Sequence, residues 1–453
     1  MKIRIREKES KPMKPAAKIA LSFLVIILIG TFLFTLPFMT RDGKGLPFLT
    51  ALFTATSGVC VTGLTLIDPV VTLTRYGQIL LALLIEVGGI SMVTFASFFM
   101  FTLKKKSALR SMRLAQEYTN LDELKQVKSL VKVIIATAFI CQAAGAAVLS
   151  IRFVPQYGAK GLWMAVFTAI SAYCNAGFDL FGMDQEFGSL INHNSDYIVM
   201  FTIMALIILG GIGFFVFYDI VNFRKTKKLS LHTRIVLVFT AALIVIGFIV
   251  FFIYEYNNEA TLGKMPLNEK IVAALFQSVT SRTAGYASID IANMNDISKI
   301  FMMFLMLIGA GSGSTAGGIK ITTFAVVMIS VISAVKNRDD AIIFGKRVDK
   351  KTVSKSLAII VMALVVIFIT ASVLLMNAPD IGGIDAFFES VSAFATVGLS
   401  VGVTSQMGLS GLLALILTMF IGRLGPICFV VALGFNRNDK AALVRPEGRI
   451  MVG

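Results

Sequence analysis

The chain has 453 residues, of which 56% are hydrophobic and 15% are charged, and its formal net charge is +16. A soluble core does not need so large an apolar fraction, so the composition indicates a polytopic membrane protein. In a soluble protein this positive charge would favour nucleic-acid binding, but here it is concentrated in short segments between apolar runs. We therefore expect a lipid bilayer, and no nucleic acid, around this chain.

The apolar runs predict the membrane spans. A run of roughly 20 residues crosses a bilayer, and such runs begin near Lys18, Tyr76, Val127, Ser195, Ile235, Ile297, Ser356 and Leu409. Lys and Arg gather in the N-terminal tail, at 104–132, 224–234 and 336–355, and after residue 437. Because cytoplasmic loops carry the excess of Lys and Arg, we expect eight spans with both termini in the cytoplasm.

One short motif occurs in four copies, each of which begins with Phe and ends with Gly. The copies are Phe53–Gly63, Phe167–Gly177, Phe276–Gly285 and Phe388–Gly398, and the third is one residue shorter than the others. Their spacing of roughly 110 residues indicates a repeated architecture. We expect an N-terminal tail 1–16, repeat 1 at 17–103, a linker with repeat 2 at 104–223, repeat 3 at 224–335, repeat 4 at 336–435 and a C-terminal tail 436–453.

Each repeat contains a helix-forming segment that is too short to cross a bilayer and that leads into its motif copy, for example Leu46 to Ser57 and Leu162 to Ala172. At 1.5 Å per residue, such a segment spans roughly 17 Å and reaches only the middle of the membrane. The loop that follows cannot face lipid, so four such loops are expected to line a shared path. The predicted fold is an all-α integral membrane protein with eight spans and four re-entrant half-helices, arranged with pseudo-fourfold symmetry around a central pore.

The four loops suit a cation. Their carbonyl groups can replace the water shell of an ion, and the C-terminal ends of four half-helices add negative potential. A terminal glycine permits positive φ and places no side chain in the path. For any single copy, a small residue that allows close helix packing is an equally good interpretation. Four copies in register favour the cation path.

Glycine clusters interrupt the second span of each repeat, at 88–89, 210–213, 309–318 and 422–425. Glycine costs about 1 kcal/mol in a helix interior, so the richest segment, 308–320, is expected to be a loop that lines the cavity below the four motif loops. A flexible kink in a packed helix is the alternative. A phosphate-binding loop is not indicated, because Ile319 separates the last glycine from Lys320 and no strand precedes it.

These loops resemble those of the Trk/Ktr/HKT superfamily of potassium transporters, and the chain is most similar to the KtrB/KtrD-type membrane subunits. The matching segments are Val59–Gly63, Asn175–Phe178, Thr283–Tyr286 and Thr396–Leu399. The resemblance implies K⁺ uptake, with K⁺ held by the backbone carbonyls of Gly63, Gly177, Gly285 and Gly398. Relatives that lean toward Na⁺ have serine at the first of these positions, so Gly63 implies a preference for K⁺. The implied filter consists of Val59, Cys60, Val61, Thr62, Gly63, Asn175, Ala176, Gly177, Thr283, Ala284, Gly285, Thr396, Val397 and Gly398.

The resemblance also implies a gate beneath the filter, with an arginine beside it. An arginine at membrane depth marks an ion path on physical grounds as well. The implied gate residues are Gly309, Gly311, Ser312, Gly313, Ser314, Thr315, Gly317, Gly318, Lys320 and Arg423. For Glu86 we leave open a pairing with Arg423 or Lys320, or a neutral carboxyl group. Arg282 is expected to pair with a carboxylate such as Glu389.

The resemblance further implies a homodimer, with 445–453 at the interface or near a regulator, in a bacterial plasma membrane. The expected regulator is a cytosolic RCK/KtrA-type ring that binds ATP or ADP. K⁺ is the expected cargo, no organic cofactor is expected, and activation by Na⁺ stays open. A Na⁺-coupled alternating-access K⁺ symporter is the alternative, although such carriers often have inverted repeats. An enzyme is not expected, because the only histidines are His193 and His232 and no nucleophile–base pattern is present.

Overall fold

The computed structural model describes residues 15–90, 124–182, 186–338 and 340–432. The predicted C-terminal tail 436–453, most of the N-terminal tail and most of the linker after repeat 1 lie outside the described residues. The described chain is helical apart from its connecting loops and one short hairpin. In this hairpin β1 (Ile342–Ile343) pairs antiparallel with β2 (Lys346–Arg347), with Ile342 opposite Arg347.

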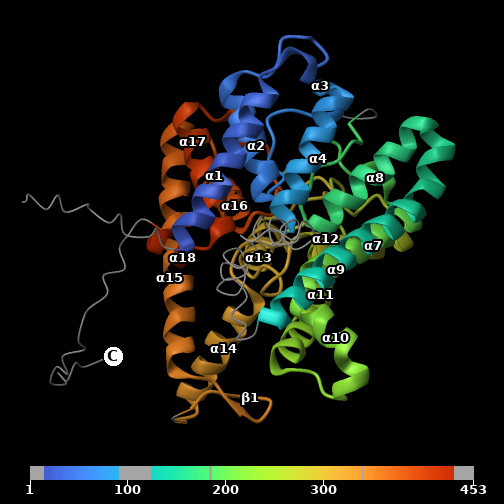
Figure 1. The fold of residues 1–453 in the computed structure, drawn as a ribbon. Coiled ribbons are helices and arrows are strands. Elements are labelled where there is room, and N and C mark those ends of the chain that lie inside the picture. Colours follow the sequence, from blue (N-terminus) through green and yellow to red (C-terminus); the bar gives the residue numbers. More distant parts are fainter. Residues whose placement is uncertain (1–14, 91–123, 183–185, 339, 433–453) are drawn as a thin grey trace, which may run out of the picture.

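Four groups of helices follow one another along the chain, as Figure 1 shows by colour. Each group contains a first helix, a half-helix and a second helix with or without a break. The first group has α1 (Pro15–Phe34), α2 (Phe48–Cys60), the short α3 (Pro69–Thr72) and α4 (Arg75–Gly89). The second has α7 (Leu124–Tyr157), α8 (Ala159–Cys174), α9 (Tyr197–Ile212) and α10 (Phe214–Thr226).

The third and fourth groups repeat this order. The third has α11 (Leu231–Glu255), α12 (Leu267–Thr280), α13 (Asp296–Leu307) and α14 (Ile321–Val335). The fourth has α15 (Lys350–Asn377), α16 (Gly383–Ala395), α17 (Leu409–Leu424) and α18 (Pro426–Ala432). Three short 3₁₀ turns lie in the connections: η1 (Pro37–Met39), η2 (Ile191–His193) and η3 (Thr404–Gln406).

The packing between groups closes a circle. Within each group the first helix packs on its own half-helix, in the pairs α1–α2, α7–α8, α11–α12 and α15–α16. Between groups, the second helix packs on the half-helix of the next group, in the pairs α4–α8, α9–α12, α13–α16 and α17–α2. The last pair joins the fourth group to the first. This is the cyclic, pseudo-fourfold arrangement that the four motif copies predict.

The long first helices present apolar side chains outward. Phe32, Ile140, Ile253 and Phe368, one on each of these helices, are 63% to 67% exposed. Large apolar patches of this kind on a helix bundle are suited to lipid rather than to water. Among the described residues, four helices are long and apolar enough to cross a membrane, and a fifth span results if the bent pair α9–α10 is counted as one. The predicted total of eight spans stays a prediction, because the other second helices are shorter or broken.

Side-chain caps fix where several of these helices begin. Ser230 accepts a hydrogen bond from the backbone N–H of Thr233 at the start of α11, and Asp196 caps α9 through Val199. Such caps satisfy backbone donors that a helix start leaves unpaired.

The chain turns by 90° between α9 and α10, at Gly213 with a φ of +94°. A glycine tolerates this conformation without the strain that a side chain would add.

Candidate functional site

The four motif loops share one backbone conformation. The residue two positions before each terminal glycine is left-handed, with φ between 51° and 73° at Val61, Asn175, Thr283 and Thr396. The glycines themselves have φ values of +93° at Gly63, +70° at Gly177, +83° at Gly285 and +92° at Gly398. Left-handed backbone is uncommon outside glycine, so its recurrence at matching positions shows that the four loops are built alike.

The four glycines face one another in a closed ring. A Cβ atom added to Gly63 would meet the carbonyl oxygen of Ala176, and one added to Gly177 would meet that of Ala284 at 2.8 Å. The same relation continues from Gly285 to Val397 and from Gly398 back to Thr62. Each glycine therefore lies against the carbonyl that precedes the next glycine. No side chain fits in this ring without displacing a neighbouring loop.

Hydrogen bonds at the half-helix ends have the same pattern in loops 1, 2 and 4 and a different pattern in loop 3. In loops 1, 2 and 4 the residue before the glycine donates to a carbonyl five residues back, for example Thr62 N–H to Ser57 at 2.8 Å. In loop 3 Ala284 N–H donates to Thr280, four residues back, at 2.9 Å. The tighter turn takes up the one residue that the third copy lacks. The φ values of Thr283 and Gly285 in loop 3 still match those of the other three loops. Val59 and Cys60, which we predicted as filter residues, belong to the last turn of α2 rather than to the loop.

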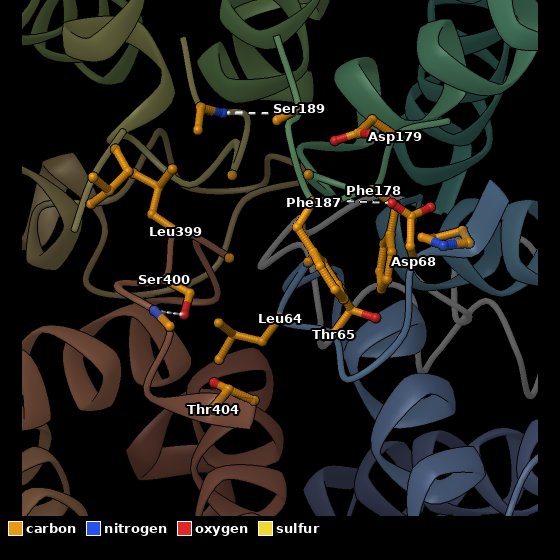
Figure 2. Close-up of a pocket in the computed structure, with 18 of the residues that line it drawn as sticks. Leu64, Thr65, Asp68, Phe178, Asp179, Phe187, Ser189, Leu399, Ser400 and Thr404 are labelled. Carbon is orange, nitrogen blue, oxygen red and sulfur yellow. Dashed lines mark hydrogen bonds between the residues drawn. The ribbon is translucent and has the colours of Figure 1, made fainter. Parts of the chain in front are cut away.

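A cavity of about 310 Å³ lies against the four glycines and is called the mouth below; Figure 2 shows residues that line it. Two carboxylates from the described part of the chain line it, Asp68 and Asp179. Asp68 accepts hydrogen bonds from the backbone N–H groups of Val70 and Phe187, at 2.9 and 3.1 Å. Burial, together with the charge of Asp68, raises the pKa of Asp179 to about 6, although the hydrogen bond from Phe181 N–H opposes this shift. Sequence reasoning missed both acids, although each follows a motif glycine by only a few residues.

The glycine-rich segment 308–320 lies on the other side of the ring and is non-helical, as predicted. Its backbone is held on two sides. Gly311 N–H donates to Gly211 of α9 at 2.9 Å, and Thr315 Oγ1 donates to the carbonyl of Tyr173 near the end of α8 at 3.2 Å. A Cβ atom on Gly317 would collide with the side chain of Thr396 in loop 4. The segment therefore contacts the bases of the motif loops.

Within this segment, most of the predicted gate residues are drawn together. Gly309 lies close to Gly317 and to the side chain of Thr283, and Gly318 lies against Ala395. Ser312 and Thr322 share a hydrogen bond of 2.6 Å between their hydroxyl groups. Ser314 is buried, and its Oγ has no hydrogen-bond partner within the described residues.

Two cations lie at this segment. Lys320 Nζ donates to the carbonyls of Ala316 and Gly317, the latter at 3.2 Å. Arg423 in α17 donates to the carbonyl of Thr315 through Nη1 and to the carbonyl of Gly88 in α4 through Nη2. Arg423 thus connects the glycine-rich segment to the end of α4. It lies beside this segment, where the sequence predicts it.

Neither the ion pair left open for Glu86 nor the one expected for Arg282 is found among the described residues. Glu86 accepts hydrogen bonds from Gln142 Nε2 at 2.8 Å and from Cys174 Sγ at 3.4 Å, and its carboxylate does not pair with Arg423 or Lys320. Sequence reasoning could not find these partners, because Gln142 in α7 and Cys174 in α8 lie 56 and 88 positions from Glu86 in the chain.

Glu389, the carboxylate that we expected to pair with Arg282, accepts hydrogen bonds from other residues instead. Glu389 accepts hydrogen bonds from Ser400 Oγ at 2.8 Å and from the backbone and side chain of Thr404. Arg282 is 2% exposed, and its Nε and Nη1 have no partner in the part of the chain that is described.

The glycines predicted to interrupt the second spans act in two ways. Gly88, Gly210 and Gly422 stay helical, and a Cβ atom on each would collide with a carbonyl of the last turn of a half-helix, at Val59, Tyr173 and Phe394. These three permit close approach instead of breaking the helix, which corrects the prediction. The breaks occur at Gly213, at Gly425 and in 308–320.

The fold and these loops define a class: a helical membrane protein in which four re-entrant loops enclose one axis. A family model described as "TrkH: Cation transport protein" matches residues 6–437. The potassium/sodium uptake protein NtpJ of Enterococcus hirae is 40% identical over 100% of this chain and 99% of its own length. The Ktr system potassium uptake protein B of Bacillus subtilis is 39% identical over 97% of both chains.

A solved structure also matches. The potassium transporter TrkH from Vibrio parahaemolyticus superimposes with a TM-score of 0.71 over 95% of this chain and 87% of that chain. Its sequence is 16% identical, so this likeness concerns the fold alone. The family model and the full-length relatives decide the assignment: this chain belongs to the TrkH family of cation transport proteins. It is a multi-pass membrane transporter and not an enzyme.

Proposed function

We propose that this chain is the K⁺-selective translocation subunit of a Ktr-type uptake system in the bacterial plasma membrane. The observation that carries the proposal is the closed ring of Gly63, Gly177, Gly285 and Gly398, in which backbone from four loops converges on one axis. Carbonyl groups in such a ring can replace the hydration shell of a monovalent cation. The names of the full-length relatives, a potassium/sodium uptake protein and a potassium uptake protein, support K⁺ as the cargo.

In this proposal the mouth is the outer entrance and 308–320 is the gate. Asp68 and Asp179 would raise the local cation concentration before an ion enters the ring. Below the ring, the segment 308–320 and the guanidinium of Arg423 would close the path, because a fixed positive charge opposes a passing cation. Opening would require the segment to leave its bonds to Gly211 and Tyr173.

The proposal includes control in trans. We infer a homodimer with both termini in the cytoplasm, regulated by an RCK/KtrA-type ring that binds ATP or ADP. The basic segments at 224–234 and 336–355 support this orientation, because cytoplasmic loops carry the excess of Lys and Arg, and α10, α14 and the hairpin adjoin these segments. A ring docked there would act close to 308–320, since α10 and α14 are the helices that adjoin this segment.

The first test is a flux measurement on the purified chain in liposomes, comparing K⁺, Rb⁺ and Na⁺, with the variant Gly63→Ser alongside. The added Cβ would lie 2.5 Å from the carbonyl oxygen of Ala176, at a φ of +93°. We expect the wild type to pass K⁺ and Rb⁺ well above Na⁺. In the variant, the loss of one well-placed carbonyl should lower the K⁺/Na⁺ flux ratio by about tenfold, which corresponds to roughly 1.4 kcal/mol.

Gly43→Ser is the matched control, because Gly43 also has a positive φ, of +68°, but has nothing within 4 Å of the added atom. The control should keep the wild-type ratio. Equal flux of K⁺ and Na⁺ through folded wild type would contradict the proposed filter. K⁺ flux that stops when a Na⁺ gradient is removed would favour the Na⁺-coupled carrier instead.

A further inference from the structure

A second large cavity lies at the end of the molecule opposite the mouth, where α10, the start of α11 and the β1–β2 hairpin meet (Figure 1). Its volume is about 680 Å³, more than twice that of the mouth. We call it the basic pocket. It is lined by Tyr218, Asp219, Asn222, Lys228, Leu229, Ser230, Leu231, Arg234, Phe344 and Lys346.

Three cations line the basic pocket, each from a different element. Lys228 belongs to the loop after α10, Arg234 to the first turn of α11 and Lys346 to β2. Arg234 and Lys346 make no ion pair or side-chain hydrogen bond with any described residue. Like charges gathered around one cavity repel one another, so the arrangement favours an anion between them.

Among the described residues that line the basic pocket, the one carboxylate, Asp219, is already hydrogen-bonded. Asp219 Oδ2 accepts hydrogen bonds from Ser230 N–H at 3.1 Å and from Thr233 Oγ1 at 2.5 Å. These bonds hold the Asp219 carboxylate against the start of α11, so the described lining has three cations against one fixed carboxylate. The N-terminal end of α11, a helix of 25 residues, adds its partial positive charge to the same site.

The rest of the wall indicates what kind of anion fits. Apolar surface lies beside the cations and comes from Tyr218, Leu229, Leu231 and Phe344. Phe344, at the tip of the hairpin, is 53% exposed. The pocket also lies at the first turn of α11, one of the four helices long enough to cross the membrane. A ligand with a phosphate at the membrane surface and an apolar body beside it matches both features.

The basic pocket is connected to 308–320 through α10. Phe214 N–H, at the start of α10, donates to the carbonyl of Gly313 at 2.8 Å. A Cβ atom on Gly213 would lie 2.8 Å from the carbonyl of Ser312. The hairpin follows α14, which begins where 308–320 ends. A ligand that holds α10 and the hairpin together therefore restrains the elements on both sides of this segment.

We propose that the basic pocket binds the phosphate of an anionic phospholipid headgroup, and that this binding adjusts the position of 308–320. The lipid assignment stands on the cavity, its cations and its apolar wall. The effect on 308–320 rests on the proposed function, because a change in cation flux is the measurement that detects this effect.

The test of binding uses purified protein and phosphatidylglycerol, with native mass spectrometry to measure the apparent Kd, and phosphatidylcholine for comparison. We expect tight binding of phosphatidylglycerol to the wild type and weak binding of phosphatidylcholine. The variant Arg234→Gln/Lys346→Gln should bind phosphatidylglycerol about 25-fold more weakly, at roughly fivefold for each charge removed.

The matched control is Arg347→Gln/Lys350→Gln, which removes two charges beside the pocket without changing its lining. Arg347 pairs instead with Asp340, at 2.8 Å. An equal loss of binding in both double variants would overturn the proposal, because it would reduce the effect to general surface charge. Equal affinity for the two lipids, or glycerol phosphate bound as tightly as the lipid, would also overturn it.

The second measurement is Rb⁺ flux in liposomes with and without phosphatidylglycerol. The wild type should respond to this lipid, and Arg234→Gln/Lys346→Gln should lose most of the response. A response that persists in the double variant would overturn the link to 308–320. Absence of selective flux in every sample would contradict the proposed function, whereas the binding result stands independently of it.

Discussion

The carboxyl group of Glu86 is the least expected feature at the scale of single residues. It is buried in α4, with Oε2 accepting from Gln142 and Cys174, and its Oε1 has no partner among the described residues. Cys174 is the last residue of half-helix α8, next to Asn175 of loop 2. Glu86 therefore fixes the base of a motif loop through neutral partners rather than through an ion pair.

This contact predicts an ordered series of stabilities. Glu86→Gln keeps an oxygen that accepts from Gln142, so it should change the free energy of unfolding by less than about 0.5 kcal/mol. Glu86→Leu leaves the amide of Gln142 with only its long contact to Cys174 Sγ, at 3.8 Å, and should cost about 1–3 kcal/mol. Thermal unfolding of the purified protein in a fixed lipid mixture measures both.

The double variant Glu86→Leu/Gln142→Leu is the control for this pair. Replacing both partners by apolar groups removes the unpaired amide, so part of the lost stability should return. If the double variant is less stable than the sum of its single changes predicts, the hydrogen bond is not what Glu86 contributes.

Asp179 gives the mouth a dependence on pH. Because its pKa is raised to about 6, the group is mostly charged near pH 7.5 and mostly neutral near pH 5. The negative charge beside Asp68 is therefore lost as the pH falls through about 6. Two unit charges a few ångströms apart interact by roughly 1 kcal/mol even in water, so the KM for Rb⁺ uptake should rise about fivefold over this range.

Asp179→Asn should have a high KM at every pH and lose most of the change between pH 7.5 and pH 5. Asp42→Asn is the control, because Asp42 lies in the exposed loop before α2 and does not line the mouth. An unchanged pH profile in Asp179→Asn would assign the titration to another group.

At the scale of elements, glycine has two distinct functions in the second helices. In 308–320 and at Gly213 it permits non-helical backbone, and at Gly88, Gly210 and Gly422 it lets two helices approach until a carbonyl of a half-helix fills the space of the missing side chain. At Gly210 the carbonyl is that of Tyr173, which also accepts from Thr315 Oγ1. This close approach brings α8, α9 and 308–320 together.

Gly210→Ala should therefore destabilise the protein, although alanine normally favours a helix by about 1 kcal/mol over glycine. The methyl group would force α9 away from α8, and overpacking of this kind costs about 1–3 kcal/mol. Gly383→Ala in α16 is the control, since nothing lies within 4 Å of its added atom. Thermal unfolding should show a loss for the first variant and a small gain or no change for the second.

A stable Gly210→Ala variant with a normal melting temperature would mean that α8 and α9 can separate without cost. Close approach to the Tyr173 carbonyl would then no longer explain why a glycine occupies this position in the helix.

The half-helices and loops could be predicted because they depend on short motifs. The first half-helix, expected at Leu46 to Ser57, is found at Phe48–Cys60, and loop 308–320 is non-helical as expected. What could not be predicted depends on partners distant in the chain. Sequence alone does not separate a glycine that breaks a helix from one that faces a carbonyl, and it does not reveal that Gln142 reaches Glu86 across 56 positions.

For the whole molecule, the circle of four groups brings distant parts of the chain into contact. Helix α17 of the fourth group packs on α2 of the first. Its Arg423 binds Thr315, 108 positions away, and Gly88, 335 positions away. One guanidinium therefore joins the first, third and fourth groups below the ring. Its planar fork of donors is suited to reaching two carbonyls at once, which a lysine ammonium on a single stem is not.

Arg423→Gln should loosen 308–320 and remove a positive charge below the ring. Each hydrogen bond from a charged donor contributes about 1.5–3 kcal/mol, so loss of one such bond should raise the Rb⁺ flux of the isolated subunit by about tenfold or more. Arg423→Lys keeps the charge but can hold only one carbonyl well, and its flux should lie between wild type and Arg423→Gln. Arg152→Gln is the control, since Arg152 forms an exposed pair with Asp196 away from 308–320.

The two Arg423 variants separate the roles of charge and of contact. If Arg423→Lys conducts like the wild type, the positive charge is what opposes the cation, and the bonds to Thr315 and Gly88 are secondary. If it conducts like Arg423→Gln, the bonds hold the path closed. A folded Arg423→Gln protein with flux at or below the wild-type level would contradict both, because then neither the charge nor the tie across three groups restrains cation movement.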